Sequence, residues 1–180
     1  MRCEDGVFRN CRIKGKFKID REITSTNPIA VGDRVNIELE MDEDNTAMIT
    51  GIETRKNYLV RSSPHNRHHK HIVASNLDQS IIIATLKEPK TSLGFIDRFL
   101  VSCDAYHIPA VIVFNKADTL HEEERQVFEA VKKIYTEIGY PVYLLSAEKR
   151  EGLEMLQALL KDKTSLLTGH SGVGKSTLIN

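Results

Sequence analysis

The sequence predicts a doubly wound α/β domain that follows a small all-β barrel. Up to about residue 61, short segments alternate polar and apolar residues between turn signals, which is typical of a small barrel. From Ile72 onward, continuous apolar runs alternate with segments of helical period, which indicates a parallel sheet covered by helices. We therefore divide the chain into a barrel of residues 1–61, a linker of residues 62–71 and an α/β domain of residues 72–180.

The barrel is predicted from three candidate strands at residues 12–19, 35–40 and 47–52, separated by turn signals such as Asn27-Pro28 and Asp44-Asn45. The first of these segments alternates basic and apolar residues. That pattern fits a barrel wall with a basic outer face. It leaves open whether this face binds nucleic-acid phosphates or is only solvated.

Residues 62–71 are polar and contain Pro64, so we predict a linker there. The segment also contains four histidines, His65, His68, His69 and His71. Their close spacing in a polar segment defines no ligand geometry, so a solvated linker is favoured over a metal site.

The α/β domain is predicted from four apolar runs at residues 80–85, 110–114, 142–145 and 165–168, which are typical of strands buried on both faces. The segments between them have helical period. A first helix places Ile96, Phe99, Leu100 and Cys103 on its apolar face, a second places Val127, Val131, Ile134 and Ile138 there, and a third spans residues 153–160. The charged residues Asp97, Arg98 and Asp104 are expected on the solvated side of the first helix.

The composition, 180 residues with 41% hydrophobic and 28% charged, is that of an ordinary globular protein. No apolar run approaches the ~20 residues of a membrane span, and the N-terminus has no signal-peptide core. Three scattered cysteines, Cys3, Cys11 and Cys103, argue for a reducing compartment. We expect a cytoplasmic monomer without a membrane partner.

The net charge of zero conceals local clusters of charge. Residues 9–21 contain six basic side chains and one acid, and residues 55–71 contain five basic side chains and no acid. Residues 38–44 contain five acids. Because the local potential decides how phosphate is attracted, zero net charge does not exclude a nucleic-acid-binding face.

Residues 169–177 form the first chemical motif, which fits the phosphate-binding pattern G-x-x-x-x-G-K-[ST]. Its members are Gly169, His170, Ser171, Gly172, Val173, Gly174, Lys175, Ser176 and Thr177. The glycines let backbone N–H groups approach phosphate oxygens. We assign catalytic roles to Lys175, which would bridge the β- and γ-phosphates, and to Ser176, whose hydroxyl would bind Mg²⁺. A glycine-rich turn that binds nothing is the alternative, and the predicted strand before the motif argues against it.

The second motif, Asn115-Lys116-Ala117-Asp118, follows the predicted strand at residues 110–114, where ligands bind in open α/β sheets. The Asp118 carboxylate can accept hydrogen bonds from the ring N–H and the exocyclic amine of guanine, whereas adenine offers no matching pair of donors. The stem of Lys116 can pack over the base, and Asn115 can tie this base loop to the phosphate loop. Alone, the pattern does not exclude an ordinary polar loop; with the phosphate loop it predicts a guanine-nucleotide site.

Ser146-Ala147 follows the next predicted strand and matches the S-A element, whose backbone N–H meets the guanine carbonyl oxygen. In ordinary GTPases the phosphate loop precedes the base loop. Here the phosphate loop begins 51 residues after Asp118. The motif order therefore predicts a circularly permuted P-loop GTPase domain.

This order of motifs behind a small β domain resembles the ribosome small-subunit-dependent GTPase A family (RsgA/YjeQ). Supporting stretches lie at residues 11–17, 26–35, 55–58 and 94–100, so the likeness covers essentially the whole chain. The resemblance implies an N-terminal OB-fold and a circularly permuted GTPase domain. It also implies switch loops and a zinc-binding domain C-terminal to Asn180, with no zinc ligand within this chain.

The resemblance further implies GTP and GDP with Mg²⁺ as ligands, and the small ribosomal subunit and its rRNA as partners. The implied activity is GTP hydrolysis during late maturation of that subunit. We expect the 180 residues alone to hydrolyse essentially no GTP, since the switch loops would lie beyond them. Two alternatives are an RNA- and nucleotide-binding module without turnover, and a P-loop ATPase or small-molecule kinase, against which Asp118 argues.

Overall fold

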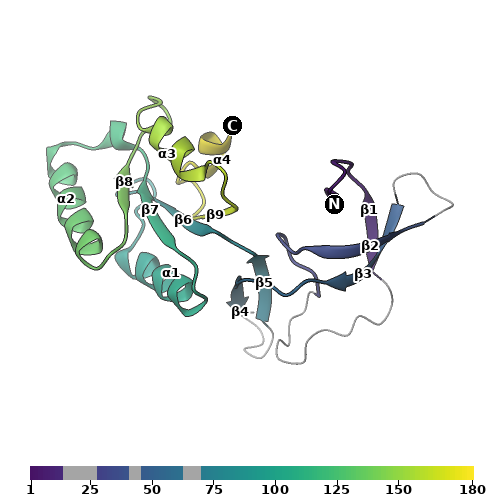
Figure 1. The fold of residues 1–180 in the computed structure, drawn as a ribbon. Helices are drawn as coiled ribbons and strands as arrows, with labels where there is room; N and C mark the ends of the chain where they lie inside the picture. Colours follow the sequence, from purple (N-terminus) through teal and green to yellow (C-terminus); the bar gives the residue numbers. More distant parts are fainter. Residues whose placement is uncertain (14–27, 41–45, 63–69) are drawn as a thin grey trace. The chain divides into compact units, whose positions relative to one another are not determined.

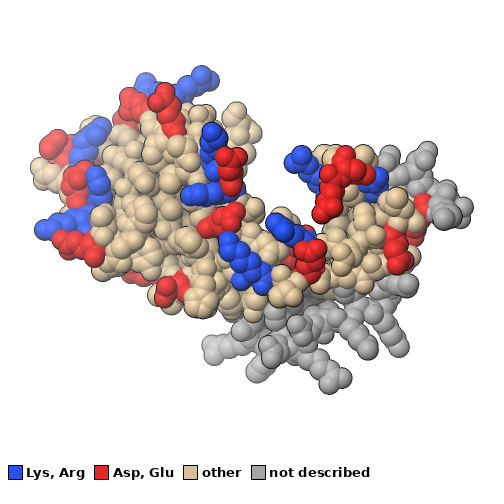
Figure 2. All heavy atoms as spheres, viewed as in Figure 1, with Lys and Arg blue, Asp and Glu red and all other residues tan. Residues whose placement is uncertain are grey.

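The computed structural model describes residues 1–13, 28–40, 46–62 and 70–180. The chain divides into two compact units, unit 1 from Met1 to Asn76 and unit 2 from Leu77 to Asn180. Most of the predicted basic strand at residues 12–19 lies outside the described residues, as do the histidines at positions 65, 68 and 69. In Figure 2, Lys and Arg side chains lie among Asp and Glu side chains on the visible face of each unit.

Unit 1 contains a three-stranded sheet in the order β1-β3-β2 (Figure 1). Strand β3 (Thr46–Ile52) is central and pairs in parallel with β1 (Asn10–Ile13) and antiparallel with β2 (Val35–Leu39). Ala47 and Ile49 of β3 are buried, since alternate residues of a strand face the same side. The strands predicted at 35–40 and 47–52 are confirmed to within a residue.

A second pair of strands replaces both ends of the predicted linker. Strand β4 (Tyr58–Ser62) pairs antiparallel with β5 (Lys70–Ser75). Ile72 and Ala74 of β5 are buried on one side of the strand. The polar composition of residues 62–71 concealed this hairpin, because a strand with one solvated face needs an apolar residue only at every second position. The compact units divide after Asn76, not at the expected linker.

A buried ion pair joins a turn of unit 1 to its strands. The Arg55 guanidinium donates from Nε to Asp33 Oδ1 (2.7 Å) and from Nη2 to Asp33 Oδ2 (2.6 Å), and the Asp33 side chain is fully buried. The Ser75 hydroxyl and the Ala30 N–H also donate to this carboxylate. Burial raises the pKa of Asp33, but the hydrogen bonds from Arg55, Ser75 and Ala30 outweigh it, so the pKa lies below its ordinary value.

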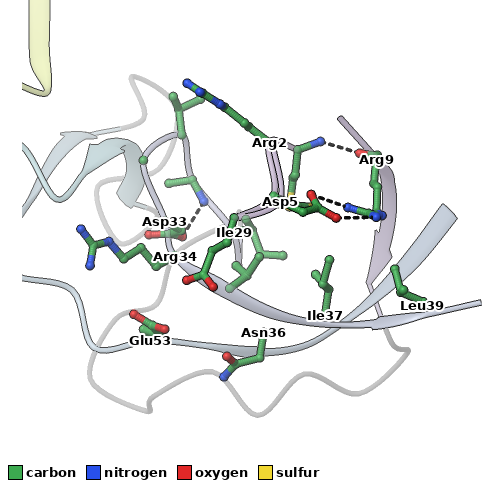
Figure 3. Close-up of a pocket in the computed structure, with 17 residues that line it drawn as sticks. Arg2, Asp5, Arg9, Ile29, Asp33, Arg34, Asn36, Ile37, Leu39 and Glu53 are labelled. Carbon is green, nitrogen blue, oxygen red and sulfur yellow. Dashed lines mark hydrogen bonds and ion pairs between the residues drawn. The ribbon is translucent and has the colours of Figure 1, made fainter. Parts of the chain in front are cut away.

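A cavity of about 1260 Å³ lies between the N-terminal segment and β2 in unit 1 (Figure 3). Figure 3 shows the Asp5 carboxylate beside the Arg9 guanidinium, an ion pair of 2.7 Å, and the apolar side chains of Ile37 and Leu39 along β2. All residues that line the cavity belong to unit 1.

Unit 2 is built on a four-stranded parallel sheet in the order β8-β7-β6-β9. Its strands are β6 (Gln79–Ala84), β7 (Ala110–Phe114), β8 (Val142–Leu144) and β9 (Ser165–Thr168). Every residue of β6 and β7 is buried, as their continuous apolar composition predicted. The chain proceeds from β6 through β7 to β8 and then returns to the other side of β6, which creates a switch in strand order between β6 and β9.

Helices cover both faces of this sheet (Figure 1). Helices α1 (Leu93–Ala105) and α2 (Glu122–Glu137) pack on one face, where Phe128 of α2 meets the Phe114 ring edge-on at 5.6 Å. Helix α3 (Leu153–Leu160) packs on the other face, where Leu156 joins the core formed by alternate residues of β6 and β7. The short helix α4 (Lys175–Ile179) follows the phosphate loop. In the described part of the chain, no helix has the length and apolarity to cross a membrane.

The apolar face predicted for α2 is partly wrong. Val131 is buried as expected, but Val127, Ile134 and Ile138 are more than half exposed. The buried side chains beside Val131 are instead two aromatics, Phe128 and Tyr135. Large rings bury more apolar area than aliphatic side chains do. The side of α2 that faces the sheet is therefore the one that carries these two rings, and it differs from the predicted side.

Helix α1 follows its prediction more closely. Ile96, Leu100 and Cys103 are buried, and burial raises the pKa of the Cys103 thiol to about 11. Asp97 lies on the exposed side, as expected, but it also accepts a hydrogen bond of 2.7 Å from the Tyr135 hydroxyl of α2. Asp97 therefore links the two helices on this face of the sheet.

Candidate functional site

The two predicted motifs emerge at the same edge of the parallel sheet. Ala84, Phe114 and Leu144 are aligned across β6, β7 and β8, and Thr168 of β9 is aligned with Ile82. The residues that follow these strands therefore meet at the carboxyl edge, on either side of the switch between β6 and β9. The base loop, the S-A element and the phosphate loop all begin there, as the sequence predicted.

The phosphate loop turns tightly between β9 and α4. Gly169 has φ +145°, and a Cβ there would lie 2.2 Å from the carbonyl oxygen of Ile83. Gly174 has φ +93°, and a Cβ there would lie 2.3 Å from Nδ2 of Asn115. Glycine is thus required at both ends of the loop, because any side chain would collide with fixed neighbours. Val173 is fully buried and anchors the loop in the core.

Lys175 lies against the inside of this loop. Its Nζ donates to the carbonyl oxygens of Gly169 (2.8 Å) and His170 (2.6 Å). His170, Ser171, Ser176 and Thr177 are exposed, whereas Lys175 is half-buried. The ammonium group is therefore held at the loop from which it would reach a bound phosphate.

Asn115 connects the three loops of the site. Its Nδ2 donates to the carbonyl oxygen of Val173 in the phosphate loop (2.9 Å), and its Oδ1 accepts from the backbone N–H of Ala147 in the S-A element (3.0 Å). Asn115 is buried, so both hydrogen bonds are protected from water. The expected tie between base loop and phosphate loop is therefore present, and it includes the S-A element as well.

Asp118 is oriented by the S-A element. The Ser146 hydroxyl donates to Asp118 Oδ1 and accepts from the backbone N–H of Lys149 (3.1 Å). Ser146 is fully buried, while Asp118 is exposed at the surface. Ala117 is buried, and its N–H donates to the carbonyl oxygen of Leu145 (3.0 Å). A buried hydroxyl thus fixes one oxygen of a carboxylate that faces solvent.

Two contacts of the site were missed by sequence reasoning. Lys116 adopts a left-handed conformation with φ +69°, and its Nζ donates to the carbonyl oxygen of Glu88. The His170 ring lies over the Phe95 ring, with centroids 3.9 Å apart and planes 31° apart. Glu88 belongs to the connection after β6, and Phe95 belongs to the first turn of α1 that follows it. That connection also starts at the carboxyl edge of the sheet, a signal that could have identified it.

The residues fit a guanine nucleotide with Mg²⁺. At Gly169 and Gly174 the backbone of the phosphate loop lies closer to its neighbours than a Cβ would allow. The Lys175 ammonium contacts this loop, and the Ser146 hydroxyl holds the Asp118 carboxylate of the base loop in one orientation. Zinc is a different case. Among the residues that the structure describes, no group of three or more His, Cys, Asp or Glu side chains could hold a metal ion.

Comparison with known families agrees with this geometry. The model of the RsgA GTPase family matches residues 52–180, and the model of the RsgA N-terminal domain matches residues 3–49. Together they span both units of the chain.

Named relatives are similar over the whole chain. It is 49% identical over 180 residues to the small ribosomal subunit biogenesis GTPase RsgA of Cytophaga hutchinsonii, covering 100% of this chain and 58% of that protein. It is 47% identical over 180 residues to RsgA 2 of Bacteroides thetaiotaomicron, covering 100% of this chain and 57% of that protein. The chain thus spans little more than half the length of these relatives.

Solved structures show the same fold. The crystal structure of YjeQ from Thermotoga maritima is similar with a TM-score of 0.77 and 35% identity, over 98% of this chain and 57% of that one. The crystal structure of YloQ, a circularly permuted GTPase, is similar with a TM-score of 0.66 and 30% identity, over 95% of this chain and 54% of that one. The predicted fold class, an OB-fold followed by a circularly permuted α/β GTPase domain, is confirmed. The chain belongs to the RsgA GTPase family.

Proposed function

We propose that this chain binds guanine nucleotides at the carboxyl edge of the unit 2 sheet and is part of a GTPase. The observation that supports this most strongly is the pair of hydrogen bonds made by Asn115. They hold the phosphate loop at Val173 and the S-A element at Ala147. In this proposal, one nucleotide spans from the base loop to Lys175.

Asp118 selects the base in this proposal. Its carboxylate accepts hydrogen bonds from the ring N–H and exocyclic amine of guanine, while the Ser146 hydroxyl keeps it in one orientation. The Ala147 N–H already donates to Asn115, which fixes the backbone of the S-A element in place. Adenine would leave the carboxylate without matching donors, and an unpaired polar group in a bound complex costs affinity.

Lys175 and Ser176 act on the phosphates. The Lys175 ammonium exchanges its contacts with the loop carbonyls for the β- and γ-phosphate oxygens, where negative charge develops during transfer to water. The Ser176 hydroxyl would hold Mg²⁺, which would supply further neutralisation of the phosphate charge. The phosphate-loop N–H groups, from Gly169 to Gly174, complete the cradle.

The wider role is proposed from the relatives, which are named small ribosomal subunit biogenesis GTPases. We propose that the whole protein hydrolyses GTP during maturation of the small ribosomal subunit in the cytoplasm, as a monomer that contacts rRNA. The OB-fold within residues 1–61 is the proposed rRNA-binding part and residues 72–180 the GTPase part. Zinc binding is proposed for a region other than the described residues.

A titration with fluorescent nucleotides tests the site. The chain should bind a GDP analogue far more tightly than the matching ADP analogue, and Asp118→Asn should weaken GDP binding and improve binding of xanthosine diphosphate. Asp104→Asn, the same change at an exposed position of α1, is the control and should leave both affinities unchanged. Equal affinity of the wild-type chain for GDP and ADP would contradict the proposal and favour a P-loop ATPase or small-molecule kinase.

A second candidate is an RNA- and nucleotide-binding module without turnover. Our proposal is that the 180 residues alone bind nucleotide but hydrolyse essentially no GTP. Phosphate release measured with and without purified small ribosomal subunits separates the two candidates. Stimulation of the whole protein by small subunits, and not by large ones, is the expected result.

A further inference from the structure

Residues 85–95, called the connection below, comprise the loop between β6 and α1 and the first turn of α1, and they close on themselves. The Thr85 N–H donates to Thr91 Oγ1 (3.1 Å), and the Thr91 N–H donates to the Thr85 carbonyl (2.8 Å). The Thr85 hydroxyl donates to the carbonyl of Pro89. Both threonines are buried, so these bonds define one conformation of the connection at the carboxyl edge of the sheet.

This connection holds the base loop from one side. Lys116, the second residue of the base motif, donates from Nζ to the carbonyl oxygen of Glu88. The neighbouring Lys87 forms an ion pair of 3.2 Å with Glu124, whose carboxylate also accepts the His121 N–H at the start of α2 (2.7 Å). The segments on both sides of Asp118 are thereby attached to the same connection.

The connection holds the phosphate loop from the other side. The Phe95 ring stacks against the His170 ring at 3.9 Å, and Pro89 lies next to Gly172, where an added Cβ would be 3.4 Å from the proline Cδ. The His170 carbonyl also accepts the Lys175 ammonium at 2.6 Å. A chain of contacts therefore runs from Phe95 through His170 to the lysine that would meet the phosphates.

We propose that residues 85–95 form a positioning segment for both nucleotide loops, and that the stacking of Phe95 on His170 sets the affinity of the site for the β-phosphate. This inference rests on the proposed binding of guanine nucleotides. The physical reason is preorganisation: a loop already fixed in its binding conformation loses less conformational entropy when the ligand arrives. Phe95 and His170 act through the loop backbone and Lys175, so Phe95 is a positioning residue.

The test compares GDP with GMP, because GMP has no β-phosphate. We expect Phe95→Ala and His170→Ala each to weaken GDP binding about fivefold and GMP binding by less than about twofold. The double variant should be no weaker than either single variant, since both remove one contact. Phe95→Tyr preserves an aromatic ring and should restore wild-type affinity.

Phe99→Ala is the matched control. It removes the same side chain one turn later on the same helix, and it should lower the two affinities equally or leave them unchanged. His170 is exposed, so His170→Ala tests the contact even if Phe95→Ala does not fold. The inference is overturned if Phe95→Ala and Phe99→Ala change the ratio of GDP affinity to GMP affinity by the same factor. It is also overturned if the losses of GDP affinity in Phe95→Ala and His170→Ala add in the double variant. A wild-type chain that binds neither nucleotide would instead overturn the proposed function.

Discussion

Substitution of Asn115 is the most direct test of how the proposed nucleotide site is assembled. In Asn115→Ala, the Val173 carbonyl loses its donor at 2.9 Å and the Ala147 N–H loses its acceptor at 3.0 Å. Asn115 is 3% exposed and Val173 is fully buried, so water cannot readily replace these partners. The variant therefore removes the side-chain hydrogen bonds that join the base loop to the phosphate loop and to the S-A element.

The size of the effect follows from the number of groups left unpaired. Each buried polar group left without its partner costs about 1–3 kcal/mol. For the two groups together we expect a loss of about 3 kcal/mol, which is toward the lower end of their summed cost. If the loops stay closed in the variant, this loss appears in the free energy of unfolding. If they open, it appears as weaker nucleotide binding, on the order of a hundredfold. The sum of the two losses is the predicted quantity.

The assay measures both losses on the same protein. Urea unfolding followed by circular dichroism gives the stability change, and titration with fluorescent GDP gives the affinity change. Thr119→Ala is the control, because it removes one half-buried hydrogen bond of 2.9 Å within the base loop without separating the three loops. Its total loss should stay below about 1.5 kcal/mol.

Asn115→Asp distinguishes hydrogen bonding from shape. Aspartate has nearly the same volume and still offers an acceptor to Ala147, but it cannot donate to the Val173 carbonyl when ionised. We expect at least half of the total loss seen for alanine. Wild-type stability and affinity in Asn115→Asp would refute the reasoning, because packing alone would then account for the arrangement of the loops.

Three further predictions concern the two units. Arg55→Ala leaves the Asp33 carboxylate buried without its charged partner and should destabilise unit 1 by about 3–5 kcal/mol in urea, whereas Arg61→Ala at an exposed position should change stability by less than about 0.5 kcal/mol. The pKa of Asp33 is lower in the folded state than its ordinary value of 3.8, so its contribution is complete above pH 3.8 and disappears as the pH falls through the folded pKa. The free energy of unfolding of Asp33→Asn, measured at decreasing pH, should therefore lack that loss. A pH dependence identical to that of the wild-type chain would contradict this prediction. The buried Cys103 thiol, with its pKa raised to about 11, should react with a maleimide at pH 8 only after unfolding, and labelling of the native chain at Cys103 would show that helix α1 is less tightly packed.

Much of unit 2 could be predicted because its signals are local. Continuous apolar runs identified all four strands, with β7 and β9 matching at both ends. The face of α2 was predicted less well. Val127 and Ile134 have the correct helical spacing but are exposed, whereas the larger rings of Phe128 and Tyr135 are buried. The Phe128 ring packs against the Phe114 ring of the sheet, a contact that helical spacing alone does not encode.

The sequence by itself determined which chemistry we propose for this protein, because the two motifs and their order need only residue types at fixed spacing. Each predicted strand also had to end where its motif began, and this placed Asn115, Ser146 and Gly169 at one edge of the sheet. Only the tertiary structure decided which neighbours hold these loops. The contacts of Phe95 with His170 and of Lys116 with Glu88 join residues 75 and 28 positions apart, and no local pattern encodes a contact that depends on how separate segments pack.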